Sequence, residues 1–516
     1  MFVIAVPSLR APRGKGLTLA IKIQFKLSSE KLKERTARSF ASNLATKISG
    51  VVIQMVTMLV LARLLTPGDF GLVGMVMPLI AIFTIFGGLG LSNAVLQKEE
   101  ITREQLSALF YLNVFVSLGV AAATFAAAPL LAAFYKAPEV IPITAIFCTV
   151  IVTSGISILQ MNLLQRSMRF DILLIAEVTS QLISSGIAIW MAMTGWGYLA
   201  LAWRAATQPV IFTVIIWSFS DWFPGRPVWD GETTWMMKFG AYSTGFSLLN
   251  SLGRQMDNVL IGWRYGQVEL GPYALAYRLF FVPVQIVTQP IGAVMITSLS
   301  RLRDEPERME RWYLLVLRIL ALCAFPPLFM AAVCAKDLVD VVVGSQWSAV
   351  TPIIRWLLPV GAIHVTYTTI GWLMVVTGRA DRQFRWSLLT VPLCILSFVI
   401  GLPWKAEGVA IAYVITNVLL FIPGFMYGIY GTNITLKQIL IAHLPGVCTT
   451  VAVCALAAAV LHLEFTNSSI LRLVFCGLLV VLGLIVGSFW TFGLEAIKSR
   501  VGFALSLIGI GKQANG

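Results

Sequence analysis

Two stretches of this chain, LARLLTPGDFGLVGMVM at residues 61–77 and IGWRYGQVELGPYALAY at residues 261–277, align at an offset of 200 positions. In each, an acid, a large apolar residue and a glycine follow one another, at residues 69–71 and 269–271. The segment before each stretch carries polar residues that step by three or four positions, which places them on one helix face. They are Asn43, Lys47, Gly50, Gln54 and Thr57 in the first copy, and Ser243, Ser247, Asn250, Arg254 and Asp257 in the second. This repetition predicts a duplicated helical scaffold.

The composition places the scaffold in a membrane. Hydrophobic residues make up 58% of the 516 residues and charged residues only 12%. A helix needs about 20 apolar residues to cross the hydrocarbon core. Fourteen such spans can be drawn, at approximately 41–63, 70–96, 106–134, 140–163, 171–193, 196–217, 239–262, 272–298, 313–335, 349–376, 386–403, 407–429, 437–461 and 470–492. We therefore predict an all-α polytopic membrane protein with about 14 transmembrane helices.

The repeat divides these spans into two parallel six-helix lobes followed by two further helices. The predicted segments are a basic N-terminal segment 1–39, an N-lobe 40–217, a linker 218–238, a C-lobe 239–430, two C-terminal helices 431–492 and a tail 493–516. Six spans per copy give both copies the same orientation, as in parallel repeats related by an axis along the membrane normal. The linker is rich in Pro, Gly and Trp, and we expect the two lobes to move as bodies about it.

The distribution of Lys and Arg predicts the orientation. The segments before the first span, after even-numbered spans and after the last span hold 26 of these residues, whereas the loops after odd-numbered spans hold five. Because Lys and Arg concentrate on the cytoplasmic side, both termini are predicted to be cytoplasmic. The net charge of +14 is spread over many short loops. It is therefore a topology signal, and no nucleic-acid partner is expected.

Catalytic motifs are absent from the sequence. There is no phosphate-binding G-x-x-x-x-G-K-[ST], no H-E-x-x-H, no C-x-x-C and no G-x-S-x-G. The three histidines, at 364, 443 and 462, are far apart along the chain. We expect neither an enzyme nor a cofactor or metal. A membrane glycosyltransferase or polymerase stays open as a less favoured alternative, because the predicted outward loops are short and poor in acids and histidines.

Four cations lie deep in predicted spans: Lys47, Arg204, Arg254 and Arg278. Each costs about 2.5–3.5 kcal/mol at a helix centre on insertion scales, so it needs water, an acid or an anionic ligand. One interpretation is internal pairing, with Asp257 holding Arg254 or Arg278 and Glu177 holding Lys47. The other is a path for an anion. Two acids cannot neutralise four cations, which favours the anion path.

Neutral polar and aromatic residues accompany the cations. The amides of Gln54 and Asn250 can bond sugar hydroxyls, and Tyr277 offers a ring with a polar edge. Each of them taken singly also fits a hydrogen bond between helices. The predicted substrate-binding set is Lys47, Gln54, Arg204, Asn250, Arg254, Asp257, Tyr277 and Arg278.

Several longer strings resemble a known family. They are ARLLTPGDFGLVGM (62–75), GLGLSNAVLQKEEITREQ (88–105), GRQMDNVLIG (253–262), LGPYALAYRLFFVPVQ (270–285) and SRLRDEPER (300–308). Together they are similar to bacterial polysaccharide exporters of the O-antigen and exopolysaccharide flippase type, within the multidrug, oligosaccharidyl-lipid and polysaccharide flippase superfamily. The resemblance implies two lobes around a cationic cavity that opens alternately to each side of the inner membrane. It implies an undecaprenyl-pyrophosphate-linked oligosaccharide as cargo, with membrane lipids, a polysaccharide polymerase and a chain-length regulator as partners.

Two related functions stay open at this point. A multidrug or cation antiporter of the same superfamily would favour acids in its cavity, and Asp257 keeps that alternative in play. A flippase for lipid-linked peptidoglycan precursors is close in chemistry. The charge of the predicted cavity is also uneven between the two lobes, since the first copy has Gln54 at the position where the second copy has Arg254.

Overall fold

The structure is a computed structural model that describes residues 46, 49–88, 101–167, 169–462 and 468–507. Within these ranges the regular elements are helices and there is no strand. In chain order they are a helix over Ser49–Leu64, α2 (Pro67–Gly88), α4 (Arg103–Tyr135), α5 (Val140–Arg166), α6 (Phe170–Met193), α7 (Tyr198–Ser218), α8 (Gly231–Arg301), α9 (Pro306–Val333), α10 (Ala335–Val342), η1 (Ser345–Trp347), α11 (Val350–Val376), α12 (Ala380–Gly401), η2 (Leu402–Trp404), α13 (Lys405–Ile429), α14 (Leu436–His462) and α15 (Ser469–Leu507).

The predicted all-α membrane fold is confirmed. Helix α8 is interrupted at Gly266, whose φ of 76° is left-handed, so it supplies two spans. With α8 counted twice and the short α10 set aside, fourteen helical segments of the described residues match the fourteen predicted spans. In the part of the chain that the structure describes, ten stretches are long and apolar enough to cross a membrane by length and composition alone. The two halves of α8 and the shorter helix over Ser49–Leu64 are not among them. The chain is a multi-pass membrane protein.

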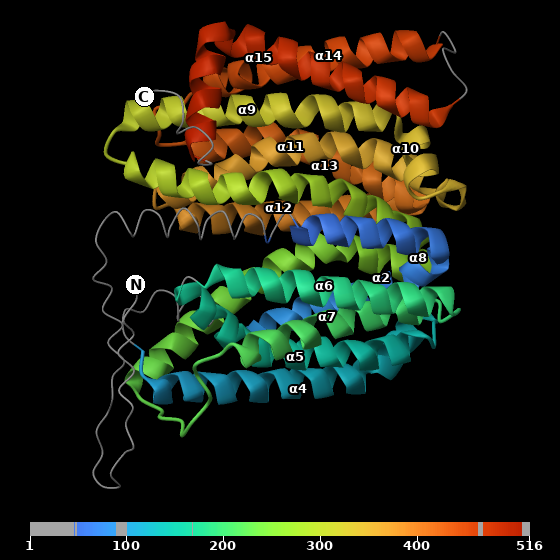
Figure 1. The fold of residues 1–516 in the computed structure, drawn as a ribbon, viewed down its shortest axis with the longest axis vertical. Helices are drawn as coiled ribbons and strands as arrows, with labels where there is room; N and C mark the ends of the chain where they lie inside the picture. The colour runs from blue at the N-terminus through green and yellow to red at the C-terminus, as the bar shows by residue number, and fades with distance from the viewer. Residues whose placement is uncertain (1–45, 47–48, 89–100, 168, 463–467, 508–516) are drawn as a thin grey trace, which may run out of the picture.

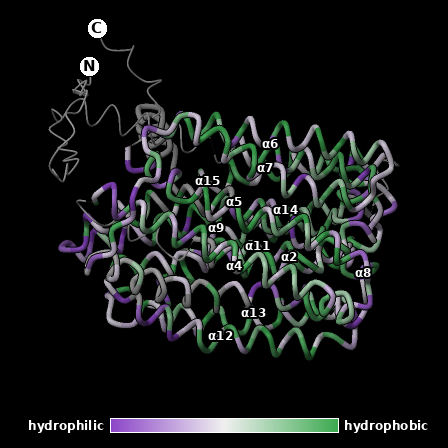
Figure 2. The backbone as a smooth tube through the Cα atoms, turned by 90° about the horizontal axis from the view of Figure 1, so that it is seen from below, coloured by the Kyte–Doolittle hydropathy of each residue, from purple (hydrophilic) through white to green (hydrophobic). Residues whose placement is uncertain are grey.

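The helices lie side by side, with α4 at one edge and α14 and α15 at the other (Figure 1). Hydrophilic residues gather toward the helix ends and hydrophobic residues lie between them (Figure 2). We term the end with loops 302–305 and 377–379 the basic end, on the left in Figure 1. The end with Gly266 and loop 343–349 is termed the opposite end.

The repeated acid, Asp69 or Glu269, caps the start of a helix in the first copy and joins two helices in the second. The Asp69 Oδ2 atom accepts hydrogen bonds from Thr66 N at 2.9 Å and Thr66 Oγ1 at 2.7 Å, which caps the start of α2. Glu269 instead accepts from the Lys405 ammonium at 2.7 Å, joining α8 to α13. This hydrogen bond raises the pKa of Lys405. The two copies therefore keep the acid at one position but use it differently.

The repeated glycines mark where the lobes meet at the opposite end. A methyl group added at Gly71 would overlap the carbonyl oxygen of Gln267, and one added at Gly271 would overlap the carbonyl oxygen of Pro67. Each contact is the other shifted by the repeat offset of 200 positions, so the crossing of α2 and α8 has internal two-fold symmetry. The α2 and α8 helices make the most extensive contact between any two elements of the described chain. Glycine is required at both positions because two backbones touch there.

Trp347 adds a second contact between the lobes at this end. Its indole N–H donates to the Ala62 carbonyl at 2.7 Å, and its ring meets the edge of Phe70 at a centroid distance of 5.1 Å. The neighbouring Gln346 donates to the same carbonyl at 2.7 Å, and Arg63 donates back to the carbonyl of Val341. Trp347 is fully buried. The opposite end is therefore sealed by packed side chains as well as by the glycine crossing.

Replacing Trp347 with Ala is expected to lower stability by about 3–5 kcal/mol, because a large buried ring leaves a cavity. The matched control is Trp404→Ala, whose ring is 69% exposed at the same end. Thermal unfolding in detergent should show a clear drop in midpoint for the first variant and little change for the second. Equal drops would contradict the seal described here.

The segment predicted as a linker, 218–238, is partly helical. Helix α8 begins at Gly231, so only residues 219–230 are irregular, and we term these the strap. The strap is bound to the start of α4. Gly225 N donates to Ser107 Oγ at 2.9 Å, Val228 N to the Glu104 carbonyl at 3.3 Å, and Gln105 Nε2 to Asp230 Oδ2 at 2.6 Å. It therefore follows the N-lobe rather than bridging open space.

Candidate substrate cavity

A cavity of about 460 Å³ lies between the two lobes, and we term it the central cavity. This volume falls in the range of about 300–1,000 Å³ that is typical of small-molecule sites. The helix over Ser49–Leu64, α2 and α7 form one wall, and both halves of α8 form the other. Its polar lining residues are Gln54, Arg204, Arg254, Gln255, Asn258, Tyr277, Arg278 and Gln285. The structure thus brings five of the eight predicted site residues to one cavity: Gln54, Arg204, Arg254, Tyr277 and Arg278.

The charge of the central cavity is entirely positive. Three of its described lining residues are arginines and none is an Asp or a Glu. Arg204 comes from α7 of the N-lobe, whereas Arg254 and Arg278 come from the two halves of α8. The guanidinium groups of Arg204 and Arg278 are close enough to repel each other. A cavity of this kind attracts an anion that can separate the two groups.

The three arginines have no acidic partner among the described residues, where none of them forms an ion pair. The buried Nε of Arg204 also lacks a hydrogen-bond acceptor. Arg472 shows the contrast, because it pairs with Asp337 at 2.7 Å. A buried guanidinium nitrogen without an acceptor is costly, and so is a guanidinium between membrane helices without a counter-charge. Water or a bound anion must therefore compensate these side chains.

Asp257 was predicted to line the same cavity or to pair with Arg254 or Arg278, and it does neither. Its carboxylate is 1% exposed and accepts from the Tyr273 hydroxyl at 2.8 Å and from Asn258 N at 2.7 Å. It lines a separate cavity of about 330 Å³ enclosed by α8, α11, α12 and α13, which we term the C-lobe cavity. The interpretation as an internal ion pair was wrong for Asp257. The excess of cations in the central cavity is larger than the sequence indicated.

Helix geometry explains why Gln255 and Asn258 were missed and Asp257 misplaced. Residues of an α-helix are rotated by about 100° from one to the next. From Arg254, Gln255 is therefore turned by about 100° and Asn258 by about 40° toward one side, and Asp257 by about 60° toward the other. Arg254 lines both cavities, as does Tyr277. The polar stripe that was predicted to form one helix face therefore lies at the border between two faces, one toward each cavity. Which face meets which cavity is decided by the packing of the neighbouring helices.

The remaining predicted residues are only partly visible. Lys47 lies outside the described residues, and so does the side chain of Asn250. Glu177, the expected partner of Lys47, accepts from Gln181 Nε2 at 2.6 Å and from Gln208 Nε2 at 3.4 Å. It lines a further cavity of about 530 Å³ on the basic side of the N-lobe, which we term the vestibule. Gln54 lines both the vestibule and the central cavity, so the two are adjacent.

Comparisons with known proteins agree with this architecture. A lipopolysaccharide biosynthesis protein, WzxC, of Escherichia coli (strain K12) is 24% identical over 398 residues, covering 75% of this chain and 80% of that protein. A succinoglycan biosynthesis transport protein, ExoT, of Rhizobium meliloti (strain 1021) is 24% identical over 353 residues, covering 68% and 71%. Among solved structures, the lipid II flippase MurJ in an inward closed conformation superposes with a TM-score of 0.70 at 13% identity, covering 88% of this chain and 98% of that one.

The likeness to MurJ at this identity concerns the fold. The sequence itself matches a family model, described as polysaccharide biosynthesis protein, over residues 60–352. This range includes the glycine crossing, the three cavity arginines and the strap. Since the match spans more than half of the chain, the chain belongs to the polysaccharide biosynthesis protein family.

Proposed function

We propose that this protein is a flippase that carries an undecaprenyl-pyrophosphate-linked oligosaccharide across the bacterial inner membrane by alternating access. The observation that carries the proposal is the central cavity, which lies between two repeated lobes and holds three arginines and no described acid. Its described lining includes no His, Cys, Asp or Glu, and its three arginines favour an anion. A transporter fits it better than an enzyme.

The route through the molecule follows from the adjoining cavities. The central cavity adjoins the vestibule at Gln54, toward the basic end. At the opposite end the glycine crossing and Trp347 block it. We assign the basic end to the cytoplasm, because cytoplasmic loops carry the excess of Lys and Arg. The described state is then the one that receives cargo from the cytoplasmic side.

Different lining residues are suited to different parts of the cargo. Arginine forms paired hydrogen bonds to phosphate oxygens, so Arg204, Arg254 and Arg278 are suited to a pyrophosphate. The amides of Gln54, Gln255 and Asn258 can bond sugar hydroxyls. The printed names of the relatives, lipopolysaccharide biosynthesis and succinoglycan transport, support a polysaccharide repeat unit as the cargo. A polymerase and a chain-length regulator would use the product outside the membrane.

The alternatives fit less well. A multidrug or cation antiporter needs a cavity that attracts cations. Among the described residues, the one buried acid near this site is Asp257, which lines the C-lobe cavity and accepts from Tyr273. A flippase for peptidoglycan precursors would carry a cargo with the same phosphate chemistry as the cargo proposed for this protein. It is separated from the proposed function by the phenotype of cells that lack the protein.

Deletion of the gene in its host is expected to remove surface polysaccharide and to cause lipid-linked oligosaccharide to accumulate. Wild-type protein and the control Arg355→Gln, a charge that lines none of the cavities, should restore the surface polymer, whereas Arg278→Gln should not. Polysaccharide is measured on the cell surface, and the intermediates in lipid extracts. Growth arrest with accumulated peptidoglycan precursor would contradict the proposal. Normal polysaccharide with sensitivity to cationic dyes would instead indicate the antiporter.

A further inference from the structure

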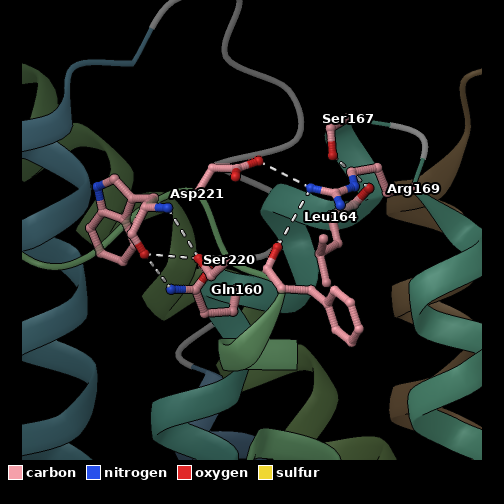
Figure 3. Close-up of polar contacts among 8 residues, drawn as sticks. Gln160, Leu164, Ser167, Arg169, Ser220 and Asp221 are labelled. Atoms are coloured by element: carbon pink, nitrogen blue, oxygen red, sulfur yellow. Dashed lines mark hydrogen bonds and ion pairs between the residues drawn. The ribbon is translucent and has the colours of Figure 1, made fainter. Parts of the chain in front are cut away.

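A second pocket, of about 200 Å³, lies at the basic end of the N-lobe, and we term it the strap pocket. It is formed by the start of α4, the end of α5 and the first residues of the strap (Figure 3). None of its lining residues also lines the central cavity or the vestibule. The strap pocket is therefore separate from the proposed transport route.

The strap is fixed firmly enough to give the pocket a defined shape. The buried Gln160 on α5 donates from Nε2 to the Trp222 carbonyl at 2.9 Å and accepts from the Ser220 hydroxyl at 2.6 Å (Figure 3). Ser220 also accepts from Trp222 N at 3.1 Å. The pocket wall is thus a hydrogen-bonded turn that Gln160 holds against α5.

The strap pocket is positively charged. Arg103, Arg166 and Arg169 line it, against one acid, Asp221. Arg169 donates to Asp221 Oδ2 at 3.0 Å and, more weakly, to the Phe219 carbonyl at 3.5 Å. The carboxylate of Asp221 is 92% exposed, so water screens it. The guanidinium of Arg103 has no partner among the described residues, which leaves the pocket with excess positive charge.

Apolar groups surround these charges near the start of α4 and the end of α5. The apolar lining residues are Ile101, Leu106, Leu163, Leu164, Phe219 and Trp222. Beside them Phe110 packs against Trp217 at 5.6 Å and Trp222 at 6.0 Å, and Phe223 is 66% exposed. Aromatic residues gather at membrane interfaces, and basic pockets between spans at the cytoplasmic side bind anionic lipid headgroups.

We propose that the strap pocket binds the phosphate of an anionic phospholipid from the leaflet at the basic end, with Arg103 and Arg169 as the ligands. The phosphodiester accepts hydrogen bonds from the guanidinium groups, and the glycerol and first acyl carbons contact the apolar wall. The lipid carrier of the cargo has the same phosphate chemistry. We assign the site to a phospholipid because the pocket shares no wall with the cavities of the transport route.

Native mass spectrometry of the full-length protein, released from nanodiscs of phosphatidylethanolamine mixed with phosphatidylglycerol, counts the retained phosphatidylglycerol. Each of Arg103→Gln and Arg169→Gln is expected to weaken retention about five-fold. The control Arg226→Gln removes a strap charge that does not line the pocket and should change nothing. Equal loss in the control would show general surface attraction and overturn the site.

Asp221→Asn separates ligand binding from a structural role of Arg169. Both Asp221→Asn and Arg169→Gln break the same ion pair, but only the second removes a proposed ligand. The proposal predicts equal or tighter phosphatidylglycerol retention in Asp221→Asn. Loss of retention there, as large as in Arg169→Gln, would mean that the ion pair only holds the strap, and would contradict the proposal. Displacement of phosphatidylglycerol by undecaprenyl pyrophosphate, but not by inorganic phosphate, would reassign the pocket to the lipid carrier.

Discussion

A disulfide between cysteines placed at Gly68 and Gln267 is expected to abolish export and to release it again when reduced. A Cβ atom at Gly68 would lie 4.0 Å from the Cγ of Gln267, across the contact between the lobes. A cysteine at position 267 would carry its Sγ where Gln267 has its Cγ, so this contact brings the two cysteine side chains within reach of a disulfide in the described state. The bond would hold the opposite end closed, and a carrier that must open there could not release its cargo.

The cross-link is measured in a background in which the seven native cysteines are replaced. Export is followed as surface polysaccharide before and after addition of oxidant and reductant, and each single cysteine serves as a control. A second control restores the native pair Cys334 and Cys476, whose sulfur atoms lie 3.1 Å apart away from the contact between the lobes. Oxidation of that pair should leave export intact. Full export with the Gly68 and Gln267 positions joined would rule out opening at this end.

Replacing Arg254 with Ala is expected to reduce export about ten- to hundred-fold at normal protein level. A hydrogen bond to a charged group contributes about 1.5–3 kcal/mol, and Arg254 lines the central cavity with no acid to pair it. Arg254→Lys should restore export only in part, because an ammonium lacks the planar fork that binds two phosphate oxygens. Initial rates of export in cells, normalised to protein in the membrane fraction, give the measurement.

Two further variants distinguish the ligand role from a structural one. Arg355→Ala removes an exposed charge on α11 outside the cavities and should leave the rate unchanged. The double variant Arg254→Ala with Asp257→Ala should export no better than Arg254→Ala, because Asp257 is held by Tyr273 rather than by Arg254. Recovery of export in the double variant would mean that the two residues stabilise each other.

Much of the fold could be predicted because a membrane imposes strong rules on sequence. Apolar length located the spans, and the repeated acid and glycine at 69–71 and 269–271 identified two lobes. The meaning of the glycines could not be predicted. Their spacing does not reveal that α2 and α8 cross in direct backbone contact, since this depends on how two distant helices pack. Trp347 likewise seals the structure through Ala62, a residue 285 positions away.

The site was predictable in its chemistry and only in part in its geometry. Deep cations are costly in a membrane, so Arg204, Arg254 and Arg278 stood out, and the structure brings them to one cavity. The position of Asp257 depended on a rotation of about 60° around the axis of α8. Helix geometry fixes that rotation, but the polar stripe alone does not show which cavity each side of α8 meets or that Asp257 accepts from Tyr273. The sequence shows which residues are charged. The cavity that each charge faces depends on how the neighbouring helices pack.

The central claim is that the arginine cavity carries a pyrophosphate-linked oligosaccharide across the membrane. The most direct measurement uses purified protein in sealed vesicles that contain a fluorescent undecaprenyl-pyrophosphate-linked oligosaccharide, with its exposure on each leaflet followed by an enzyme that cannot cross the bilayer. We predict rapid exchange between leaflets with wild-type protein and with Arg355→Ala, and exchange close to that of empty vesicles with Arg254→Ala. Exchange by Arg254→Ala at the wild-type rate, or no exchange above empty vesicles by the folded wild-type protein, would contradict the account.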